Sequence, residues 1–194
     1  HLNTSGMPLG TAIRQSSFNA VSIMTGTGYG SADFSAWGGF ASTLLLIAMF
    51  IGGCGGSTTC GIKVFRLQVL ATTARVQISR LLRPHAVVLA YYNKRPVAPE
   101  VMDSVMGFFY LYILCFVLLA ILLGMMGLDF VTALSGAATS ISNVGPGLGN
   151  LIGASGNFAT VPDAAKWVMA FGMLLGRLEL FTVLVMLTPA FWSR

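Results

Sequence analysis

The hydrophobic positions divide the chain into apolar segments separated by glycine-rich breaks. Val105 to Met126 carries no charged residue and exceeds the roughly 20 residues that a helix needs to cross a bilayer. Gly38 to Ile51 is also strongly apolar but stops after about four helical turns, and a helical pattern resumes over Ile62 to Ile78. A last apolar segment begins at Pro162-Asp163 and runs to about Leu187. This pattern predicts an all-α integral membrane protein.

Two further apolar segments, Arg14 to Met24 and Phe130 to Ile141, are too short to span a bilayer. Each runs directly into a glycine-rich stretch, so we predict two re-entrant pore helices whose carbonyl ends face those stretches. This orientation would point the negative end of each helix dipole toward a cation. Residues 1–13 are polar and predict a loop, and Asp129 is expected to cap the second short helix.

The first glycine-rich stretch reads Thr25-Gly26-Thr27-Gly28-Tyr29-Gly30. Non-helical backbone at membrane depth is tolerated only where protein buries it or where it lines a watery pathway. Alternating glycines let successive carbonyl groups turn to one side, which is typical of a potassium selectivity filter. The stretch therefore predicts a filter.

The second stretch repeats the first. Aligning Gly28 with Gly145 brings further matching residues into register, and each unit is a short helix, a glycine segment and a spanning helix. The matched pairs are Ala20 with Ala137, Ser22 with Thr139, Thr25 with Ser142, Thr27 with Val144, and Gly30 with Gly147. The chain therefore holds one complete span-pore-span unit and one that lacks its first span.

Composition and charge agree with this reading. Apolar residues make up 55% of the chain and charged residues 9%, against about 25% in an ordinary soluble domain. Seven basic residues and no acidic one lie between Lys63 and Arg95, which marks that connection as cytoplasmic. The three cysteines show no metal spacing, and no nucleophile-base or catalytic carboxylate pair emerges. We therefore expect neither an enzyme nor a cofactor.

The break between the first two apolar helices, Gly52 to Gly61, allows three interpretations. A phosphate-binding loop would need lysine directly after its second glycine, but Ile62 intervenes before Lys63. Close helix packing by small residues is a second interpretation. We favour a gate, because breaks in membrane helices mark ion pathways and glycine and hydroxyl residues rearrange at low cost.

Three charged residues outside the basic connection are candidates for function. Arg177 and Glu179 lie in the last apolar segment, where each charge costs roughly 2.5–3.5 kcal/mol on insertion scales. Arg177 is expected to face the pore and repel cations, with an ion pair to another helix as the alternative; for Glu179 the ion pair is favoured. Asp33 could enrich cations at the filter mouth or simply be solvated.

The sequence resembles the Trk/Ktr/HKT superfamily of potassium transporters, and most closely its bacterial TrkH type. The resemblance covers nearly the whole chain and rests on four motifs in the expected order. These are VSIMTGTGYGSADFSAW (21–37), MFIGGCGGSTTCGIKVFR (49–66), SNVGPGLGN (142–150) and GRLELFTVLVMLTPAFW (176–192).

The resemblance implies four span-pore-span repeats around a pseudo-fourfold pore. This chain would supply the third repeat without its first span (1–80), a cytoplasmic basic linker (81–99) and the fourth repeat (100–194). K⁺, as the transported ion, would bind at Thr27, Gly28, Val144 and Gly145. The other expected filter residues are Tyr29, Gly30, Asn143, Pro146 and Gly147. The expected gate comprises Gly52, Gly53, Gly55, Gly56, Ser57, Thr58, Thr59, Gly61 and Arg177.

The filter departs from the potassium-channel pattern, because Gly26 and Asn143 stand where a threonine would be and Pro146 where a tyrosine would be. We therefore expect fewer well-ordered ion sites. The resemblance also implies a multi-pass protein of the inner cell membrane, a homodimer and a cytoplasmic nucleotide-binding regulatory subunit of the TrkA type. The chain starts at His1 and is expected to be a fragment. The alternatives are a sodium-coupled secondary transporter, which predicts inverted repeats, and a non-transporting scaffold.

Overall fold

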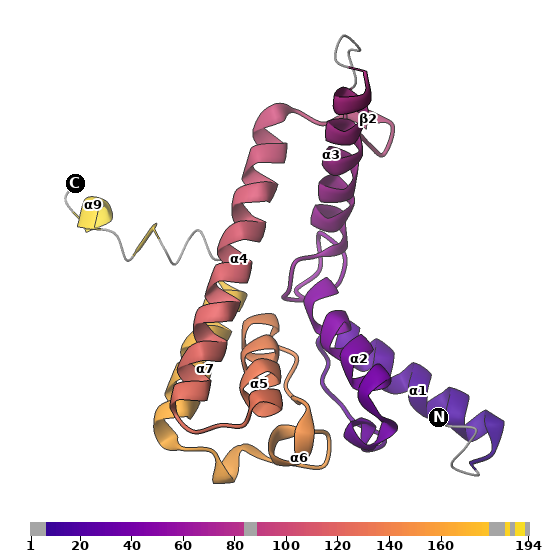
Figure 1. Ribbon diagram of the computed structural model, residues 1–194, viewed down its shortest axis with the longest axis vertical. Coiled ribbons are helices and arrows are strands. Elements are labelled where there is room, and N and C mark those ends of the chain that lie inside the picture. The colour runs from indigo at the N-terminus through magenta and orange to yellow at the C-terminus, as the bar shows by residue number, and fades with distance from the viewer. Residues whose placement is uncertain (1–6, 84–88, 179–184, 187–188, 193–194) are drawn as a thin grey trace.

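The computed structural model describes residues 7–83, 89–178, 185–186 and 189–192, and the chain is mostly helical (Figure 1). The α-helices are α1 (Leu9–Met24), α2 (Gly39–Ile51), α3 (Val64–Leu82), α4 (Pro99–Met125), α5 (Phe130–Ser142), α6 (Gly149–Ile152), α7 (Asp163–Arg177) and α9 (Pro189–Trp192). Two short 3₁₀ helices, η1 (Phe34–Trp37) and η2 (Phe158–Thr160), and two strands, β1 (Tyr91–Tyr92) and β2 (Arg95–Pro96), complete the described elements.

The longest helix, α4, confirms the clearest predicted span. Within the described ranges it is the one helix long and apolar enough to cross a membrane: it has 27 residues, and an 18-residue stretch within it has a mean hydropathy of 2.7. It begins at Pro99, six residues before the charge-free segment, because proline is well suited to a first helical turn, where backbone N–H groups lack partners anyway. The predicted short helices are present as α1 and α5.

Two boundaries differ from the prediction. Residues 9–13 are helical, so the predicted loop over 1–13 is wrong there; α1 begins directly after Pro8 and buries Ala12 on the same face as Asn19. After the break, α3 continues to Leu82. The basic connection beyond it contains a hairpin whose turn residues, Asn93 and Lys94, have φ of 48° and 63°, as tight hairpin turns require.

The last predicted span is described only in part. The helix α7 covers its first 15 residues and ends at Arg177. Glu179 lies outside the described residues, as do 180–184, so the interpretation of that charge stays a prediction.

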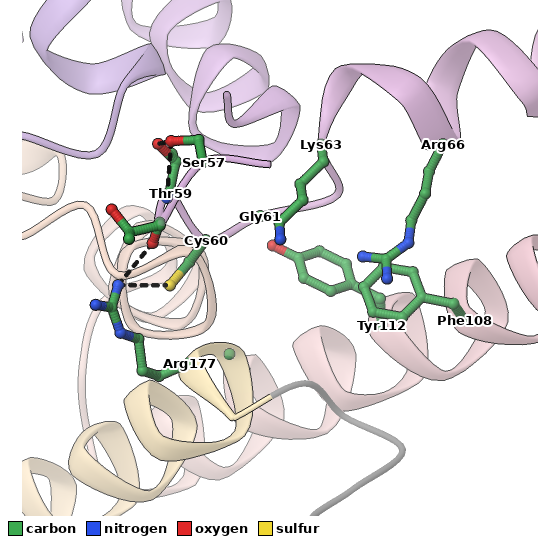
Figure 2. A pocket seen from close by; sticks show the side chains of 11 residues that line it. Ser57, Thr59, Cys60, Gly61, Lys63, Arg66, Phe108, Tyr112 and Arg177 are labelled. Atoms are coloured by element: carbon green, nitrogen blue, oxygen red, sulfur yellow. Dashed lines mark hydrogen bonds between the residues drawn. The ribbon is translucent and has the colours of Figure 1, made fainter. Parts of the chain in front are cut away.

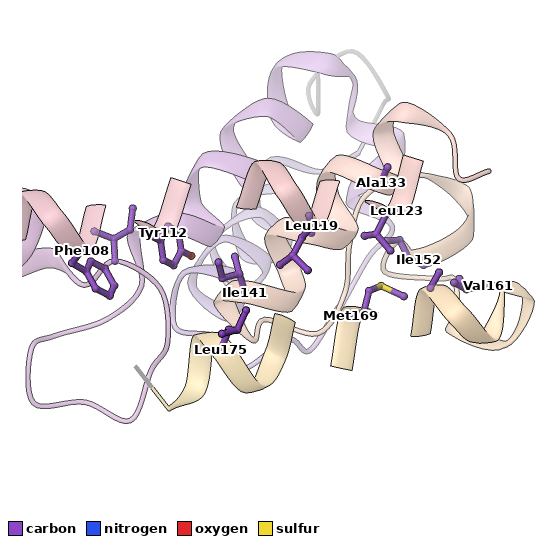
Figure 3. Close-up of a cluster of buried hydrophobic side chains, with 13 residues drawn as sticks. Phe108, Tyr112, Leu119, Leu123, Ala133, Ile141, Ile152, Val161, Met169 and Leu175 are labelled. Carbon is purple, nitrogen blue, oxygen red and sulfur yellow. The ribbon is translucent and has the colours of Figure 1, made fainter. Parts of the chain in front are cut away.

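The short helix α5 lies at the centre of the structure, packed against α4, α7 and α2 (Figure 1). Ten of its 13 residues are buried, and most of them are alanine, serine, threonine or glycine. In a bilayer such small residues let helix backbones approach closely, and packing rather than water exclusion holds the helices together. Larger side chains of α4 and α7, including Leu119, Leu123, Met169 and Leu175, close around it (Figure 3).

The first unit packs on the second through a separate apolar cluster. Ile23 of α1, Phe34 of η1, and Met49 of α2 are each at most 1% exposed and share this cluster with Val144 and Leu148. The two glycine-rich segments are therefore held side by side by the helices that precede and follow them.

Candidate functional site

The first glycine segment folds back onto the end of α1. Beyond the last helical residue, Met24, the N–H groups of Thr27 and Gly28 both donate to the carbonyl of Ser22, at 2.9 and 3.3 Å. Gly26 and Gly28 have φ of 70° and 76°, which glycine adopts without the cost that other residues pay. The backbone donors thus face the helix.

The second segment folds onto the end of α5 in the same way. The N–H of Val144 donates to the carbonyl of Thr139 at 3.1 Å, and the N–H of Gly145 donates to the Thr139 hydroxyl at 2.9 Å. Asn143 and Gly145 have φ of 52° and 111°. Asparagine is one of the few residues other than glycine that tolerate this left-handed conformation.

These bonds confirm the internal repeat at the level of individual atoms. The donors Thr27 and Val144 were paired by the sequence alignment, and so were the residues that accept from them, Ser22 and Thr139. In the described structure, the carbonyl groups of Thr27, Gly28, Val144 and Gly145 accept no hydrogen bond. Four free carbonyl oxygens on two segments are suitable ligands for a monovalent cation.

The two segments touch at their central glycines. A Cβ atom on Gly28 would overlap the carbonyl oxygen of Val144 and lie 3.1 Å from Cδ of Pro146. A Cβ atom on Gly145 would lie 3.9 Å from the Cα of Gly28. Only glycine at position 28 allows the two backbones to approach this closely.

Three further residues predicted for the filter differ in their surroundings, since Gly147 and Gly30 pack against other parts of the chain and Tyr29 is exposed. Gly147 is buried, its N–H donates to the carbonyl of Ile152 at 2.6 Å, and a side chain there would collide with Ile152. A Cβ atom on Gly30 would lie 3.2 Å from the Ala154 side chain. The Tyr29 side chain is 72% exposed. Gly147 thus joins the second glycine segment to the end of α6, and Gly30 packs the first glycine segment against the loop after α6.

The predicted gate is a compact loop between α2 and α3. Its two ends are joined by hydrogen bonds, from Ile62 N–H to the Phe50 carbonyl at 2.9 Å and from Val64 N–H to the Gly53 carbonyl at 3.1 Å. Gly52 and Gly61 face each other there with φ of 67° and 87°. These bonds satisfy backbone groups that a broken helix would otherwise leave without partners.

The middle of the loop is less tightly held. The Ser57 and Thr59 hydroxyls are 2.8 Å apart, and the Thr59 N–H donates to the Ser57 hydroxyl at 3.2 Å. Gly55 and Gly56 are exposed, although a Cβ on Gly55 would lie 3.0 Å from the Phe65 ring. The contacts within the loop at this point are therefore local.

The structure brings Arg177 against this loop (Figure 2). Its Nη1 donates to the Thr58 carbonyl at 2.7 Å and lies 3.8 Å from Sγ of Cys60. Both groups line a cavity of about 270 Å³ together with Lys63 and Arg66. Among the described residues that line this cavity, Lys63, Arg66 and Arg177 are basic and none is acidic, so these side chains make it unfavourable for a cation.

Several residues of this cavity were not predicted. The guanidinium of Arg66 lies 3.8 Å from the centre of the Phe108 ring, a cation–π contact across α3 and α4. The hydroxyl groups of Tyr112 and Ser142 form a hydrogen bond of 2.7 Å, which connects α4 to the end of α5. Their positions on separate helices gave no local sequence signal.

The sequence does contain a signal for the close packing of α7 on α5, which the prediction did not use: two glycines four positions apart on α7. Gly172 and Gly176 form a small-xxx-small pair on α7, which is typical of helix contacts in membranes. A side chain at Gly176 would collide with the Ile141 carbonyl, and one at Gly172 would lie 2.9 Å from Leu119. These glycines bring Arg177 to the loop.

The two aspartates near the filters have structural partners. Asp129 accepts from the Thr132 N–H at 3.2 Å, which confirms its predicted role as the cap of α5. Asp33 accepts from the Ser35 N–H at 3.0 Å and from the Ser155 hydroxyl at 3.0 Å, so it links η1 to the loop after α6. Hydrogen bonding therefore fixes the position of both carboxylates.

The fold and the site define a class of protein. Two repeated pore-helix and glycine-segment units, a membrane-length helix and a broken helix are features of membrane cation-transport proteins. The chain belongs to the TrkH family, described as cation transport proteins, whose family match covers residues 3–194. This confirms the resemblance found in the sequence.

Individual relatives agree with this assignment. The chain is 49% identical to the Trk system potassium uptake protein TrkI of Halomonas elongata, over 97% of this chain and 38% of that protein. It is 37% identical to TrkH of Escherichia coli K12, over 93% of this chain and 37% of the relative. The crystal structure of the potassium transporter TrkH from Vibrio parahaemolyticus superposes with a TM-score of 0.84 at 42% identity, covering 92% of this chain and 38% of that one. The chain thus spans just over a third of the length of these relatives.

Proposed function

We propose that the protein containing this chain takes up K⁺ across the inner cell membrane as a multi-pass protein. The chain would supply two of four filter segments around a pseudo-fourfold pore, with K⁺ held by carbonyl groups of Thr27, Gly28, Val144 and Gly145. The observation that carries this proposal is the matched pair of glycine segments, whose N–H groups bond back to the pore helices while these four carbonyls stay free. The names of the relatives, which describe potassium uptake, support the choice of ion.

We further propose that the loop from Gly52 to Gly61 and Arg177 form the gate. The support is the 2.7 Å bond from Arg177 to the Thr58 carbonyl, in a cavity lined by three basic residues. A cation leaving the filter would meet both the loop and this positive charge. Opening would require the loop and Arg177 to separate. By family resemblance, a homodimer and a TrkA-type regulatory subunit complete the assembly.

Uptake of rubidium against sodium by the full-length parent tests the filter. Wild-type protein should prefer rubidium, and Gly145→Ser should lower the rubidium-to-sodium ratio, because a side chain at φ 111° distorts the segment. Gly124→Ser is a matched control, since a Cβ atom on Gly124 in α4 would have no neighbour within 4 Å. A ratio unchanged by Gly145→Ser would make Gly145 a turn residue and overturn the filter.

The gate has its own test. Arg177→Gln removes the charge and the bond to the Thr58 carbonyl, and a hydrogen bond from a charged group contributes about 1.5–3 kcal/mol where it is buried, less where water competes. We therefore expect rubidium uptake by the parent to rise several-fold. Uptake that stays equal to that of the wild type would show that this bond does not hold the pore closed.

A further inference from the structure

The residue two places before each central glycine lies next to the proposed gate loop in the first repeat and bonds to the helix that carries Arg177 in the second. In the first repeat this residue is Gly26, where a Cβ atom would lie 3.5 Å from Cγ2 of Thr59 in the loop. In the second repeat it is Asn143, whose side-chain Nδ2 donates to the Met173 carbonyl of α7 at 2.9 Å. The same position therefore meets the loop in one repeat and the helix that carries Arg177 in the other.

The helix α7 carries both the carbonyl that Asn143 contacts and the side chain of Arg177. Met173 and Arg177 are four residues apart, which places them one turn apart on the same face of a continuous helix. Gly176, between them, packs against the Ile141 carbonyl with no room for a side chain. Because the end of α7 is packed this tightly, a movement of the helix backbone at Arg177 also moves the carbonyl that Asn143 contacts.

The contacts close a ring between the two filter segments. Thr58 accepts from Arg177, the next residue Thr59 lies beside Gly26, and a Cβ atom on Gly26 would also lie 3.7 Å from the carbonyl oxygen of Asn143. The side chain of Asn143 bonds to α7, and its backbone carbonyl lies next to Gly26. Asn143 therefore connects the second glycine segment both to α7 and to the first glycine segment.

We propose that Asn143 is a positioning residue that couples the second filter segment to the gate. Its amide links the segment to α7, and α7 links it to the loop through Arg177. The state of the gate therefore changes the geometry of the filter, and the ion in the filter changes the stability of the gate, since coupling between two sites is reciprocal. This inference rests on the proposed filter and gate.

A double-mutant cycle in the full-length parent tests the coupling. The rubidium-to-sodium uptake ratio is measured for wild type, Asn143→Gly, Arg177→Gln and the double variant. Glycine keeps the left-handed backbone, as Gly26 does in the first repeat, and removes only the amide. Coupling predicts that Arg177→Gln changes the ratio by factors that differ about three- to tenfold between the two backgrounds, the range expected for one hydrogen bond. Equal factors would overturn the proposal.

Asn19 provides the matched control. Its side-chain Nδ2 donates to the Ser31 hydroxyl at 3.0 Å, and its side-chain Oδ1 accepts from the Ser31 N–H at 3.1 Å. Asn19 therefore holds the residue that directly follows the first filter segment. Asn19→Ala should loosen a filter segment, yet Arg177→Gln should change the ratio by the same factor with and without it. A departure as large as that of Asn143→Gly would mean that any loosened filter produces the effect, and the specific role of Asn143 would be wrong.

A second readout serves if Asn143→Gly takes up no ion. Cys60 lies beside Arg177 and is 8% exposed, so its alkylation rate reports on loop opening in a purified parent whose other cysteines are serine. Coupling predicts that the rate differs between rubidium and sodium, and that Asn143→Gly removes this difference. A difference retained by the variant would overturn the coupling. A wild-type parent without rubidium uptake would instead refute the proposed function.

Discussion

The contact between the two glycine segments, which form the proposed filter, makes Gly28→Ala the most informative single substitution. Alanine in the left-handed region at φ 76° costs about 1–2 kcal/mol. The new methyl group would also overlap the Val144 carbonyl oxygen, one of the four proposed ion ligands, and crowd Pro146. Forcing a group into a packed site costs about 1–3 kcal/mol more. The sum corresponds to a loss of at least about thirtyfold in the population of the intact filter.

Gly145→Ala separates the two costs. Alanine at position 145 would be strained by the backbone angle φ of 111°, but its methyl group would meet only the Cα of Gly28 at 3.9 Å, an ordinary contact. Gly10→Ala, in open space on α1, introduces neither backbone strain nor steric overlap. We therefore expect rubidium uptake by the parent to fall most in Gly28→Ala, less in Gly145→Ala, and not in Gly10→Ala.

The assay measures rubidium and sodium uptake at matched expression, with thermal denaturation of each purified variant to detect loss of folding. A Gly28→Ala variant with wild-type uptake and an unchanged rubidium-to-sodium ratio would refute the close approach of the segments. Equal losses in Gly28→Ala and Gly145→Ala would refute the steric part alone. Backbone strain would then explain both.

Two further predictions concern the supports of the site. Gly176→Ala would drive a methyl group into the Ile141 carbonyl and should destabilise the parent by about 1–3 kcal/mol in thermal denaturation, whereas Gly124→Ala should not; equal midpoints would contradict the close packing of α7. Asp129→Ala should cost about 1 kcal/mol as a lost cap. Hydrogen bonding from Thr132 lowers the pKa of the Asp129 carboxyl, so the cap stabilises at neutral pH and this contribution is lost as the pH falls through the depressed pKa. A difference in denaturation midpoint between wild type and Asp129→Ala that does not shrink as the pH is lowered stepwise from 7 into the acid range would contradict this.

Much of this protein follows from its sequence by local rules. The charge-free run of α4 predicts a span because a bilayer offers no partners for charged groups. The alternating glycines around Gly28 and Gly145 predict filter-like turns because only glycine adopts their backbone angles freely. The two repeated units are offset by 117 positions, which predicts equivalent hydrogen bonds in each unit. The bonds that Thr27 and Val144 donate to Ser22 and Thr139 confirm this prediction.

The contacts of the gate residues required the tertiary structure. The start of α1 at Leu9 was missed because residues 1–13 were grouped as one polar loop, although Leu9, Ala12 and Ile13 are apolar and Pro8 directly precedes the helix. The contact of Arg177 with Thr58 joins residues 119 positions apart, and that of Asn143 with Met173 joins residues 30 apart. A sequence pattern records which side chains are costly in a membrane, but the partner that offsets the cost is selected by packing. Here that packing is the glycine face of α7 on the buried helix α5, which brings the proposed filter and the proposed gate within reach of each other.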